Sequence, residues 1–461
     1  MVNLPNNIIL LTIDCLRADK LGCLGNARHI TPNIDLLAKD GTMFTQAFSN
    51  GPITSFSFPS ILTSSYALMY PPVKFRNDEL YRVYMPGIYG GVTLAEMLKG
   101  QGFYTIGIHS NPWLSSYYNY NRGFDEFIEM MDSIPVAGHC ILSKARQFLP
   151  TISGKIDFYH SAEITKRAID LMKNAPQKRC FLWVHYMDPH YPYLAHSFRK
   201  NLSIYLRTFP KIRDRVDPVL VRSFFTDTAE YLNASPNVYH RTKLQEELYN
   251  GAIMYVDRIV GRFLKGLEQM GIAADENTII LAADHGEEFG EHEDTGHGMK
   301  LYDELLHVPL IIAGPSIEKG RIVHSQIQLL DLGPTLCSIL GITPPNSFQG
   351  QSILATCQGG IGTPVISEYA KKNEQAFSYR DGNWKFILTV RNETMNRELY
   401  DLKKDRKETT DVYVKNKGMT TIYERCLLKH IEEEGITRRK YDLIRRIEQI
   451  KHANIRTTGH S

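Results

Sequence analysis

The sequence predicts an α/β fold with a doubly wound, mostly parallel sheet, followed by a small antiparallel sheet and a helical tail. Three observations lead to this prediction. Short apolar runs end abruptly at polar residues, helical periodicity lies between them, and alternating strand-like patterns return only near the C-terminal end. Continuous apolarity is typical of strands covered on both faces, and strands that alternate with helices form parallel sheets.

The predicted strands of the main sheet are rich in β-branched residues. They are IILLTID (8–14), YTIGIHSN (104–111), FLWVHYMDPH (181–190), NTIILAADHG (277–286) and HVPLIIAG (307–314). A helix is predicted over 33–41, with Thr31 as its N-cap, Pro32 at the first helical position and Gly41 as its stop.

Two stretches interrupt this alternation. Residues 140–175 and 195–250 are rich in Lys, Arg and Tyr and less regular, so we expect insertions around the site. We expect the chain to divide into a main α/β domain over 1–363, a small β subdomain over 364–417 and a helical tail over 418–461. The tail has apolar residues at helical spacing, which favours a helix packed on its own domain over a partner-binding arm.

Composition and charge narrow the class of protein. With 461 residues, 43% of them hydrophobic, the chain can bury a large core. The net charge of +3 gives no reason to expect nucleic acid as a partner. Seven scattered cysteines without C-x-x-C spacing indicate reduced thiols. No signal sequence and no apolar run near the ~20 residues of a membrane helix is present, so we expect a cytoplasmic protein without a transmembrane anchor.

Acids and histidines stand where the predicted strands end. Asp14 closes the first run, Asp188 and His190 close the third, and Asp284 and His285 close the fourth. Ligands bind at the carboxyl ends of the strands in sheets of this class, so we expect a site there.

The residue types at these ends suit a metal ion. Asp14, Asp284 and His285 offer hard oxygen and imidazole donors for one divalent cation, Ca, Mg, Mn or Zn. Arg17 and Asp19 follow in DCLRAD, and a structural salt-bridge cluster around Asp14 is an equally open interpretation.

The stretch SFSFPSILTS (55–64) supplies a candidate nucleophile. Ser57 precedes Pro59, so it can be a simple N-cap or the start of a helix whose free amide groups bind a tetrahedral oxyanion. Together with the metal-binding residues, its hydroxyl predicts transfer of a phosphoryl or sulfuryl group through a covalent seryl intermediate. Asn111, at another strand end, is open to substrate contact or to capping.

The ordered motifs resemble the sulfatase family of the alkaline phosphatase superfamily. The resemblance covers about residues 6–410, and its motifs are TIDCLRADKLGCLG, TPNIDLLAKDGTMFTQAF, SFPSILTS, RGFDEF, HYMDPHYPY, DHGEEFGEH, GHGMKLYDELLHVPLII and SYRDGNWKFILTVRNETMNRELYDL. It implies a metal-dependent hydrolase of sulfuric or phosphoric esters that acts on a small anionic ester.

The resemblance also implies roles for single residues. Asp14, Asp284 and His285, with the Ser57 hydroxyl, match the metal ligands, and Ser57 matches the nucleophile. His190 and His297 match residues that contact the anionic group or protonate the leaving oxygen. The residues with proposed supporting roles are Arg17, Asp19 and Asp188. A second cation on Asp188, His190 and His297 is an alternative to the single cation that we favour.

The sequence departs from the family pattern C-x-P-S-R or S-x-P-S-R. Ile61 replaces the arginine read by the enzyme that makes formylglycine. The chain therefore resembles the branch with an unmodified Ser or Thr, for which phosphate esters are as good a prediction as sulfate esters. Alternatives are a phosphodiesterase, a phospho-head-group transferase and a catalytically silent binding protein. Self-association through the C-terminal helix also stays open.

Overall fold

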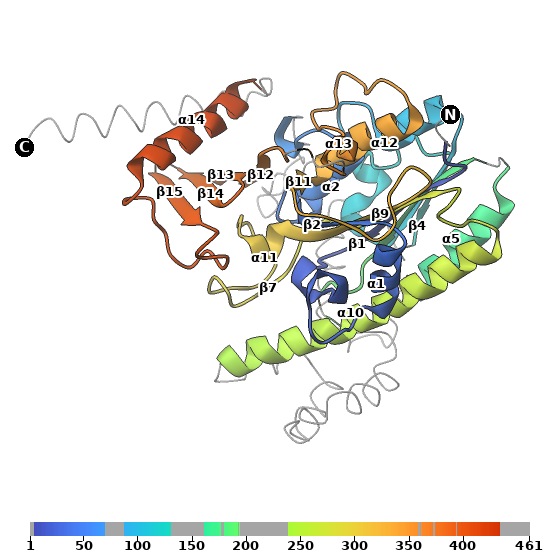
Figure 1. The fold of residues 1–461 in the computed structure, drawn as a ribbon, viewed down its shortest axis with the longest axis horizontal. Helices are drawn as coiled ribbons and strands as arrows, with labels where there is room; N and C mark the ends of the chain where they lie inside the picture. The colour runs from blue at the N-terminus through green and yellow to red at the C-terminus, as the bar shows by residue number, and fades with distance from the viewer. Residues whose placement is uncertain are drawn as a thin grey trace, which may run out of the picture.

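A computed structural model describes residues 4–69, 87–130, 161–176, 179–191, 193, 238–357, 360, 362–371, 374–392 and 394–433. Within them a central sheet of nine strands runs in the order β10-β2-β9-β6-β1-β5-β3-β4, with β11 also paired to β2 (Figure 1). The strands are β1 (Ile8–Ile13), β2 (Thr42–Phe48), β3 (Tyr104–His109), β4 (Glu126–Glu129), β5 (Cys180–Tyr186), β6 (Thr278–Ala283), β9 (His307–Ala313), β10 (Arg321–Val323) and β11 (Ile327–Gln328).

The sheet is mostly parallel, which confirms the predicted fold class. The central strand β1 pairs in parallel with both β5 and β6. The exception is β9, which runs antiparallel to β6 and to β2. The chain passes from β6 to β9 through β7 (Glu288–Phe289), β8 (Thr295–Gly296) and α11 (Asp303–Leu306). This connection does not carry the chain back to the end of the sheet where β6 begins. The next strand, β9, therefore runs in the opposite direction to β6.

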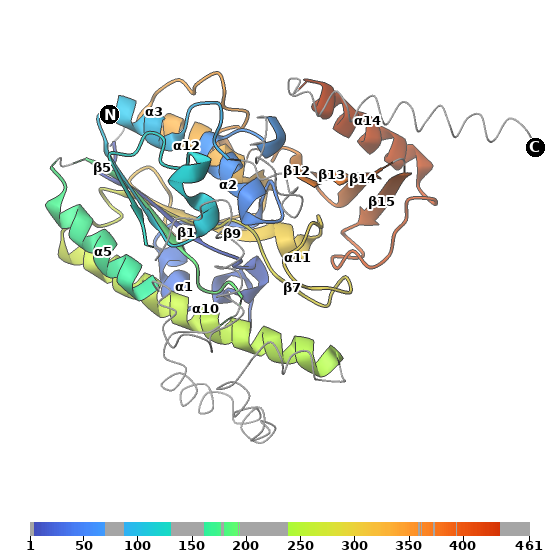
Figure 2. The ribbon, with the colours of Figure 1, turned by 180° about the vertical axis from the view of Figure 1, so that it is seen from behind.

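Helices cover both faces of the sheet, as a doubly wound fold requires (Figures 1 and 2). One face carries α1 (Pro32–Lys39), α5 (Ser161–Asn174) and α10 (Val238–Gln269), and the other carries α2 (Thr54–Thr63), α3 (Leu94–Gly100), α12 (Leu332–Leu340) and α13 (Leu354–Cys357). Short 3-10 helices occur at Ala18–Lys20, Gly22–Leu24, Ala67–Met69, Pro112–Leu114, Ser116–Tyr118 and Leu329–Asp331.

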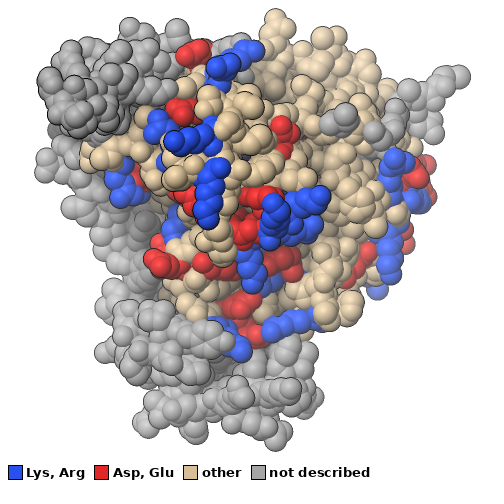
Figure 3. Space-filling model, turned by 60° about the vertical axis from the view of Figure 1, so that its left-hand side comes forward, with Lys and Arg blue, Asp and Glu red and all other residues tan. Residues whose placement is uncertain are grey.

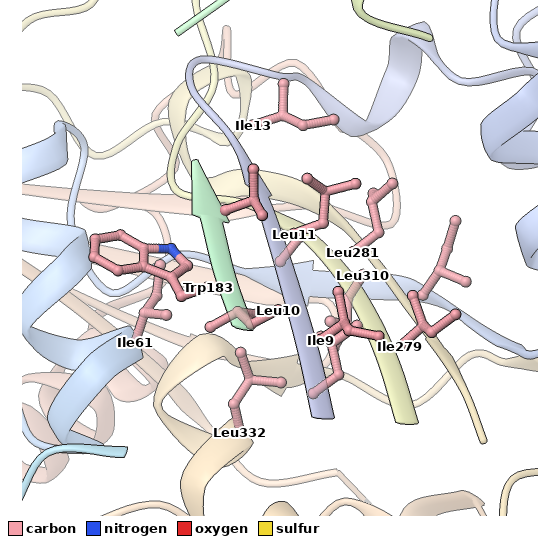
Figure 4. Close-up of a cluster of buried hydrophobic side chains, with 14 of the residues drawn as sticks. Ile9, Leu10, Leu11, Ile13, Ile61, Trp183, Ile279, Leu281, Leu310 and Leu332 are labelled. Atoms are coloured by element: carbon pink, nitrogen blue, oxygen red, sulfur yellow. The ribbon is translucent and has the colours of Figure 1, made fainter. Parts of the chain in front are cut away.

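The central strands form the middle of the hydrophobic core. Every residue of β1 and β6 is buried. Figure 4 shows side chains of these strands together with Ile61 from α2, Trp183 from β5 and Leu332 from α12. The buried core explains why the runs read as continuous rather than alternating apolar sequence.

Two sequence-based expectations need correction. Within the stretches predicted as irregular insertions, 161–174 forms α5 and the part from 238 onward begins the long helix α10. These helices pack on each other and α5 packs on β5, because their apolar stripes cover the sheet. The remaining parts, 140–160 and 195–237, lie outside the described residues.

The helix predicted at 33–41 does form, as α1, with Thr31 at the N-cap and Pro32 as the first helical residue.

A second, antiparallel sheet follows the main domain, as predicted. Its strands are β12 (Val365–Lys371), β13 (Glu374–Asp381), β14 (Trp384–Arg391) and β15 (Thr394–Asp401), paired in sequence order. Helix α14 (Lys417–Glu433) lies on this sheet and buries Tyr423, Leu427 and Ile431. This part of the tail therefore packs on its own domain, and 434–461 lies outside the described residues.

None of the described helices is both long enough and apolar enough to cross a membrane.

Candidate active site

The pairing of β1 with β6 brings Asp14 and Asp284 together. Ile13 is in register with Ala283, so the residues that follow the two strands leave the sheet side by side. Both carboxylates are fully buried, and so is His285, the next residue after Asp284. The three residues singled out at strand ends therefore share one buried cluster.

His285 stands at the centre of this cluster. Its Nε2 lies 3.6 Å from Oδ1 of Asp14 and 3.5 Å from Oδ2 of Asp284. The hydroxyl oxygen of Thr54 lies 3.4 Å from the same nitrogen. On the other side of the ring, Nδ1 is 2.8 Å from the carbonyl oxygen of Gly286, which can only accept a hydrogen bond. That bond places the proton on Nδ1 and leaves a lone pair on Nε2, facing the three oxygens.

The two buried carboxylates of this cluster suit a cation, which would neutralise their charge. Burial, followed by the nearby charge of Asp14, raises the pKa of Asp284 well above its ordinary value. Burial also opposes the charge of Asp14, but the hydrogen bond from His185 and the nearby imidazoles of His190 and His285 lower its pKa. Burial, ahead of the charge of His297, lowers the pKa of His285 to about 4, so its imidazole is neutral.

The geometry fits a divalent metal. Oδ2 of Asp284 is buried and has no hydrogen-bond partner among the described residues. Ligand atoms about 3 to 4 Å apart are what a cation with bonds of about 2.0 to 2.6 Å produces. Asp14, Asp284 and His285 thus offer two carboxylates and one imidazole lone pair, with a hydroxyl beside them.

Hydrogen bonds from outside the cluster orient the two carboxylates, as is usual around metal ligands. Oδ2 of Asp14 accepts from Nδ2 of Asn111 at 2.8 Å and lies 3.3 Å from Nε2 of His185. Oδ1 of Asp284 accepts from the amides of Cys15 at 3.2 Å and of His285 at 2.9 Å.

Asn111 also caps a 3-10 helix, because its Oδ1 accepts from the amide of Trp113 at 2.9 Å. Its Nδ2 thus donates to Asp14, and its Oδ1 caps the 3-10 helix. The sequence reasoning missed His185, although a histidine in the middle of the apolar run FLWVHY was a visible signal.

The expectation that Ser57 starts a helix is wrong. Helix α2 begins three residues earlier, at Thr54, with Ile53 as its N-cap. The amide of Ser57 already donates to the carbonyl oxygen of Ile53 at 3.1 Å, and its hydroxyl donates to the carbonyl oxygen of Thr54 at 3.4 Å. Ser57 therefore lies inside the helix and its amide is used within it.

Thr54 takes the position that Ser57 was expected to occupy. It is the first residue of α2, ahead of Phe56 and Ser57, whose amides donate to the carbonyl oxygen of Ile53. Its hydroxyl is the one that contacts His285. The S-x-P-S pattern drew attention to Ser57, whereas the hydroxyl one helical turn earlier is the one that reaches the cluster.

His190 and His297 lie next to the acidic cluster. The ring centroid of His297 is 4.8 Å from that of His285 and 4.8 Å from that of His190. Nδ1 of His190 is 2.6 Å from the carbonyl oxygen of Tyr191, so it donates its proton there. Both histidines are half-buried, and the three rings form a row that begins at His285.

The group of possible second-cation ligands differs from the predicted one. Donor atoms of Cys15, His190 and His297 lie within 4.8 Å of one another. Asp188 was expected in this group, but its Oδ2 accepts from the amide and hydroxyl of Ser161, at 3.3 and 2.5 Å, where α5 begins. Asp188 is directed there because α5 packs on β5, whose end carries it.

Cys15 is the residue next to Asp14. Its Sγ donates to Oδ1 of Asp14 at 2.9 Å and lies 3.6 Å from Nδ1 of His297. Burial, reinforced by the charge of Asp14, raises the pKa of this thiol. In the absence of a cation it is therefore a protonated thiol that joins the acidic cluster to the row of histidines.

Arg17 and Asp19 hold the loop that follows β6. The guanidinium of Arg17 donates to both oxygens of Asp19, at 2.9 and 2.8 Å, and to the carbonyl oxygen of Glu287 at 2.9 Å. A cleft of about 1160 Å³ lies on this side, with lining residues from the main domain and from the small sheet, among them Arg17, Lys20, His307 and Arg380. On the face shown in Figure 3, basic and acidic side chains interleave.

Two protein-family models match this chain. A family model described as Sulfatase matches residues 6–342, and a model described as N-sulphoglucosamine sulphohydrolase, C-terminal, matches residues 290–434. An arylsulfatase of Clostridium perfringens is 24% identical over 94% of this chain and 96% of its own length.

Solved structures share the fold. A protein in complex with its substrate D-glucosamine-2-N,6-O-disulfate superposes with a TM-score of 0.71 at 18% identity, covering 94% of this chain and 98% of that one. The phosphonate monoester hydrolase of Agrobacterium radiobacter has a TM-score of 0.67 at 20% identity, covering 94% and 96%.

Proposed function

Because the chain belongs to the sulfatase family of the alkaline phosphatase superfamily, we propose that it is a metal-dependent hydrolase of sulfuric or phosphoric esters. The observation that carries this proposal is the cluster in which Asp14, Asp284 and Thr54 all face the lone pair of His285. A catalytically silent relative would have no reason to keep two buried carboxylates in mutual repulsion.

The metal-binding residues in this proposal are Asp14, Asp284 and His285. A divalent cation bound there would neutralise the carboxylates, favour the ionised form of a neighbouring hydroxyl and stabilise charge on the transferred group. The hydroxyl next to these residues is that of Thr54, and we therefore place the nucleophile at Thr54, with Ser57 as the alternative that the sequence pattern favours.

The reaction then has two steps. The hydroxyl of Thr54 loses its proton to solvent, its ionised oxygen attacks the phosphorus or sulfur atom, and the bond to the leaving oxygen breaks. His190 or His297 gives that oxygen a proton, so the alcohol leaves neutral. Water next attacks the threonyl ester, releases the inorganic anion and restores the hydroxyl. The first two amides of α2, those of Thr54 and Ser55, precede the amides that are bonded to Ile53 and can hold the oxygens of the transferred group.

The class of ester depends on this nucleophile. A threonine has no route to a formylglycine hydrate, so its ester must be cleaved by attack of water. Phosphoryl threonine can react in this way or pass its group to an alcohol, which keeps a phosphodiesterase or a phospho-head-group transferase as alternatives. We place phosphate esters level with sulfate esters.

The first test is steady-state turnover of an aryl sulfate, an aryl phosphate monoester and an aryl phosphodiester. Each is assayed with Mg, Mn, Ca and Zn after removal of bound metal. We expect cation-dependent turnover of at least one ester. The absence of turnover with every cation, in protein that binds the cation tightly, would support the silent alternative.

Three further proposals concern the rest of the chain. The first is that the main α/β domain ends at residue 363 and the small β subdomain at residue 417. A reducing compartment such as the cytoplasm is supported by free thiols at Cys15, Cys23, Cys337 and Cys426. Self-association through 418–461 is to be tested by light scattering of the full chain and of a chain ending at residue 433.

A further inference from the structure

A buried carboxylate contacts the ring of His297 on the side that the proposed reaction does not use. Oε1 of Glu287 lies 3.0 Å from Nδ1 of His297. The Glu287 side chain is completely buried, whereas the His297 side chain is 21% exposed. The other group near Nδ1 is the thiol of Cys15, at 3.6 Å.

The backbone around Glu287 is held on two sides. Its amide donates to the carbonyl oxygen of Glu304 at 3.1 Å, and its carbonyl accepts from Nη1 of Arg17 at 2.9 Å. Its Oε2 is buried and has no hydrogen-bond partner among the described residues. A buried carboxylate is costly unless it is paired, and this one contacts the imidazole of His297 and the side chain of Tyr193.

The pairing restricts what His297 can do. A carboxylate only accepts hydrogen bonds, so the contact fixes a proton on Nδ1 and leaves Nε2 as the nitrogen that exchanges a proton with other groups. Burial of Glu287 on an ordered backbone holds the ring at one angle.

We propose that Glu287 is a positioning residue for His297, holding its ring so that Nε2 donates the proton to the leaving oxygen. This inference rests on the proposed function. It distinguishes His297 from His190, whose Nδ1 is bonded to the neutral carbonyl oxygen of Tyr191, and so assigns the proton donor that the sequence left open between the two.

The test uses a series of phosphate or sulfate esters whose leaving alcohols range from nitrophenol to simple alkyl alcohols. Protonation matters little for nitrophenol and greatly for an alkyl alcohol. We expect Glu287→Gln to lower kcat by about 100-fold or more for alkyl esters, with a much smaller loss for the nitrophenyl ester and little change in KM. If the role of Glu287 were purely structural, kcat would fall by the same factor for all substrates, and that result would overturn the proposal.

Two comparisons sharpen this test. Glu288→Gln is the matched control, because Glu288 is also buried but pairs with Lys300 instead of His297. We expect it to leave the dependence on the leaving group unchanged. In the His297→Gln background, Glu287→Gln should have no further effect on that dependence. An additive effect in the double variant would contradict the proposal.

A second measurement does not require turnover. Nitrogen NMR of the histidine rings, with His297→Gln for assignment, reports which ring nitrogen carries the proton. We expect His297 to be protonated on Nδ1 in the wild type and to lose this preference in Glu287→Gln. A wild-type protein with this preference but without esterase activity would reject the proposed function and leave the pairing intact. The same tautomer in both proteins would reject the inference alone.

Discussion

The hydroxyl oxygen of Thr54 lies 3.4 Å from Nε2 of His285, whereas the hydroxyl of Ser57 turns back to the carbonyl oxygen of Thr54. The two residues are three apart in α2, so about one helical turn separates them. In the proposed function, this relationship selects the hydroxyl that a metal ion on Asp14, Asp284 and His285 would activate.

Thr54→Ala should therefore abolish turnover, with a loss of at least about 1000-fold in kcat, while metal binding is largely kept. Ser57→Ala should retain most activity, and Thr54→Ser should retain part of it. Steady-state kinetics with metal content measured on the same samples checks this prediction. If Ser57→Ala is the inactive variant, the S-x-P-S pattern identified the nucleophile correctly.

Ser57 should carry no modification. We expect the peptide that contains residues 54–61 to have the mass that the sequence encodes, because Ile61 stands where the modifying enzyme reads arginine. Mass spectrometry of the digested protein checks this. A mass lower by two hydrogen atoms at Ser57 would show that formylglycine forms despite Ile61.

Asp284→Asn should have opposite effects with and without metal. Removing one of two facing carboxylates should weaken metal binding by at least about 100-fold. In metal-free protein the same change removes repulsion from Asp14 and should raise the free energy of unfolding, by about 1 to 3 kcal/mol. Denaturant unfolding at neutral pH, with a chelator or with excess cation, measures both effects.

Asp294→Asn is the control for this experiment. The Asp294 side chain is largely exposed, and its ion pair with Lys300 is long, at 3.7 Å. It should change neither quantity. A metal-free Asp284→Asn protein that is less stable than the wild type would mean that the carboxylate has a structural partner of its own.

Asp303 should make folding sensitive to acid. It pairs with Arg380 at 2.8 Å and with Lys385 at 2.9 Å, which joins α11 to the small sheet. Burial opposes the charge of Asp303, but these two cations outweigh it and lower its pKa below the ordinary value. A depressed pKa in the folded state gives stability that is present above the unfolded pKa and is lost as the pH falls through the folded pKa.

Asp303→Asn should consequently lower the free energy of unfolding by about 3 kcal/mol at neutral pH. The difference from the wild type should shrink in strong acid, where Asp303 is protonated. Unfolding curves from neutral pH to below pH 3 measure it. A difference that stays constant over this range would show that shape, and not charge, makes the contribution.

Asp188 should act as a structural residue. Asp188→Ala removes the hydrogen bonds to Ser161 at the start of α5 and should cost about 1 kcal/mol of stability. The number of cations bound per chain should stay the same. Loss of one cation in this variant would restore Asp188 to the second-cation site, in place of Cys15.

Much of the site could be predicted from local patterns. Asp14, Asp284 and His285 were found because each follows a buried strand, and parallel strands that lie side by side end at the same edge of the sheet. His190 and His297 were found with the help of the family resemblance, and the structure places them beside His285. His185 was missed although its place in an apolar run marked it, and Glu287 was missed because it is not distinguished from an ordinary polar residue until its partner is known.

The sequence by itself determined the central strands, helix α1, the small second sheet and the acids at the strand ends, because these depend on apolar periodicity and on residues at strand ends. Only the tertiary structure decided which hydroxyl of α2 faces His285, that Asp188 turns to Ser161, and that Glu287 holds His297. These choices depend on side-chain directions set by residues far apart in the chain. No local pattern encodes a direction that is fixed only when distant elements pack together.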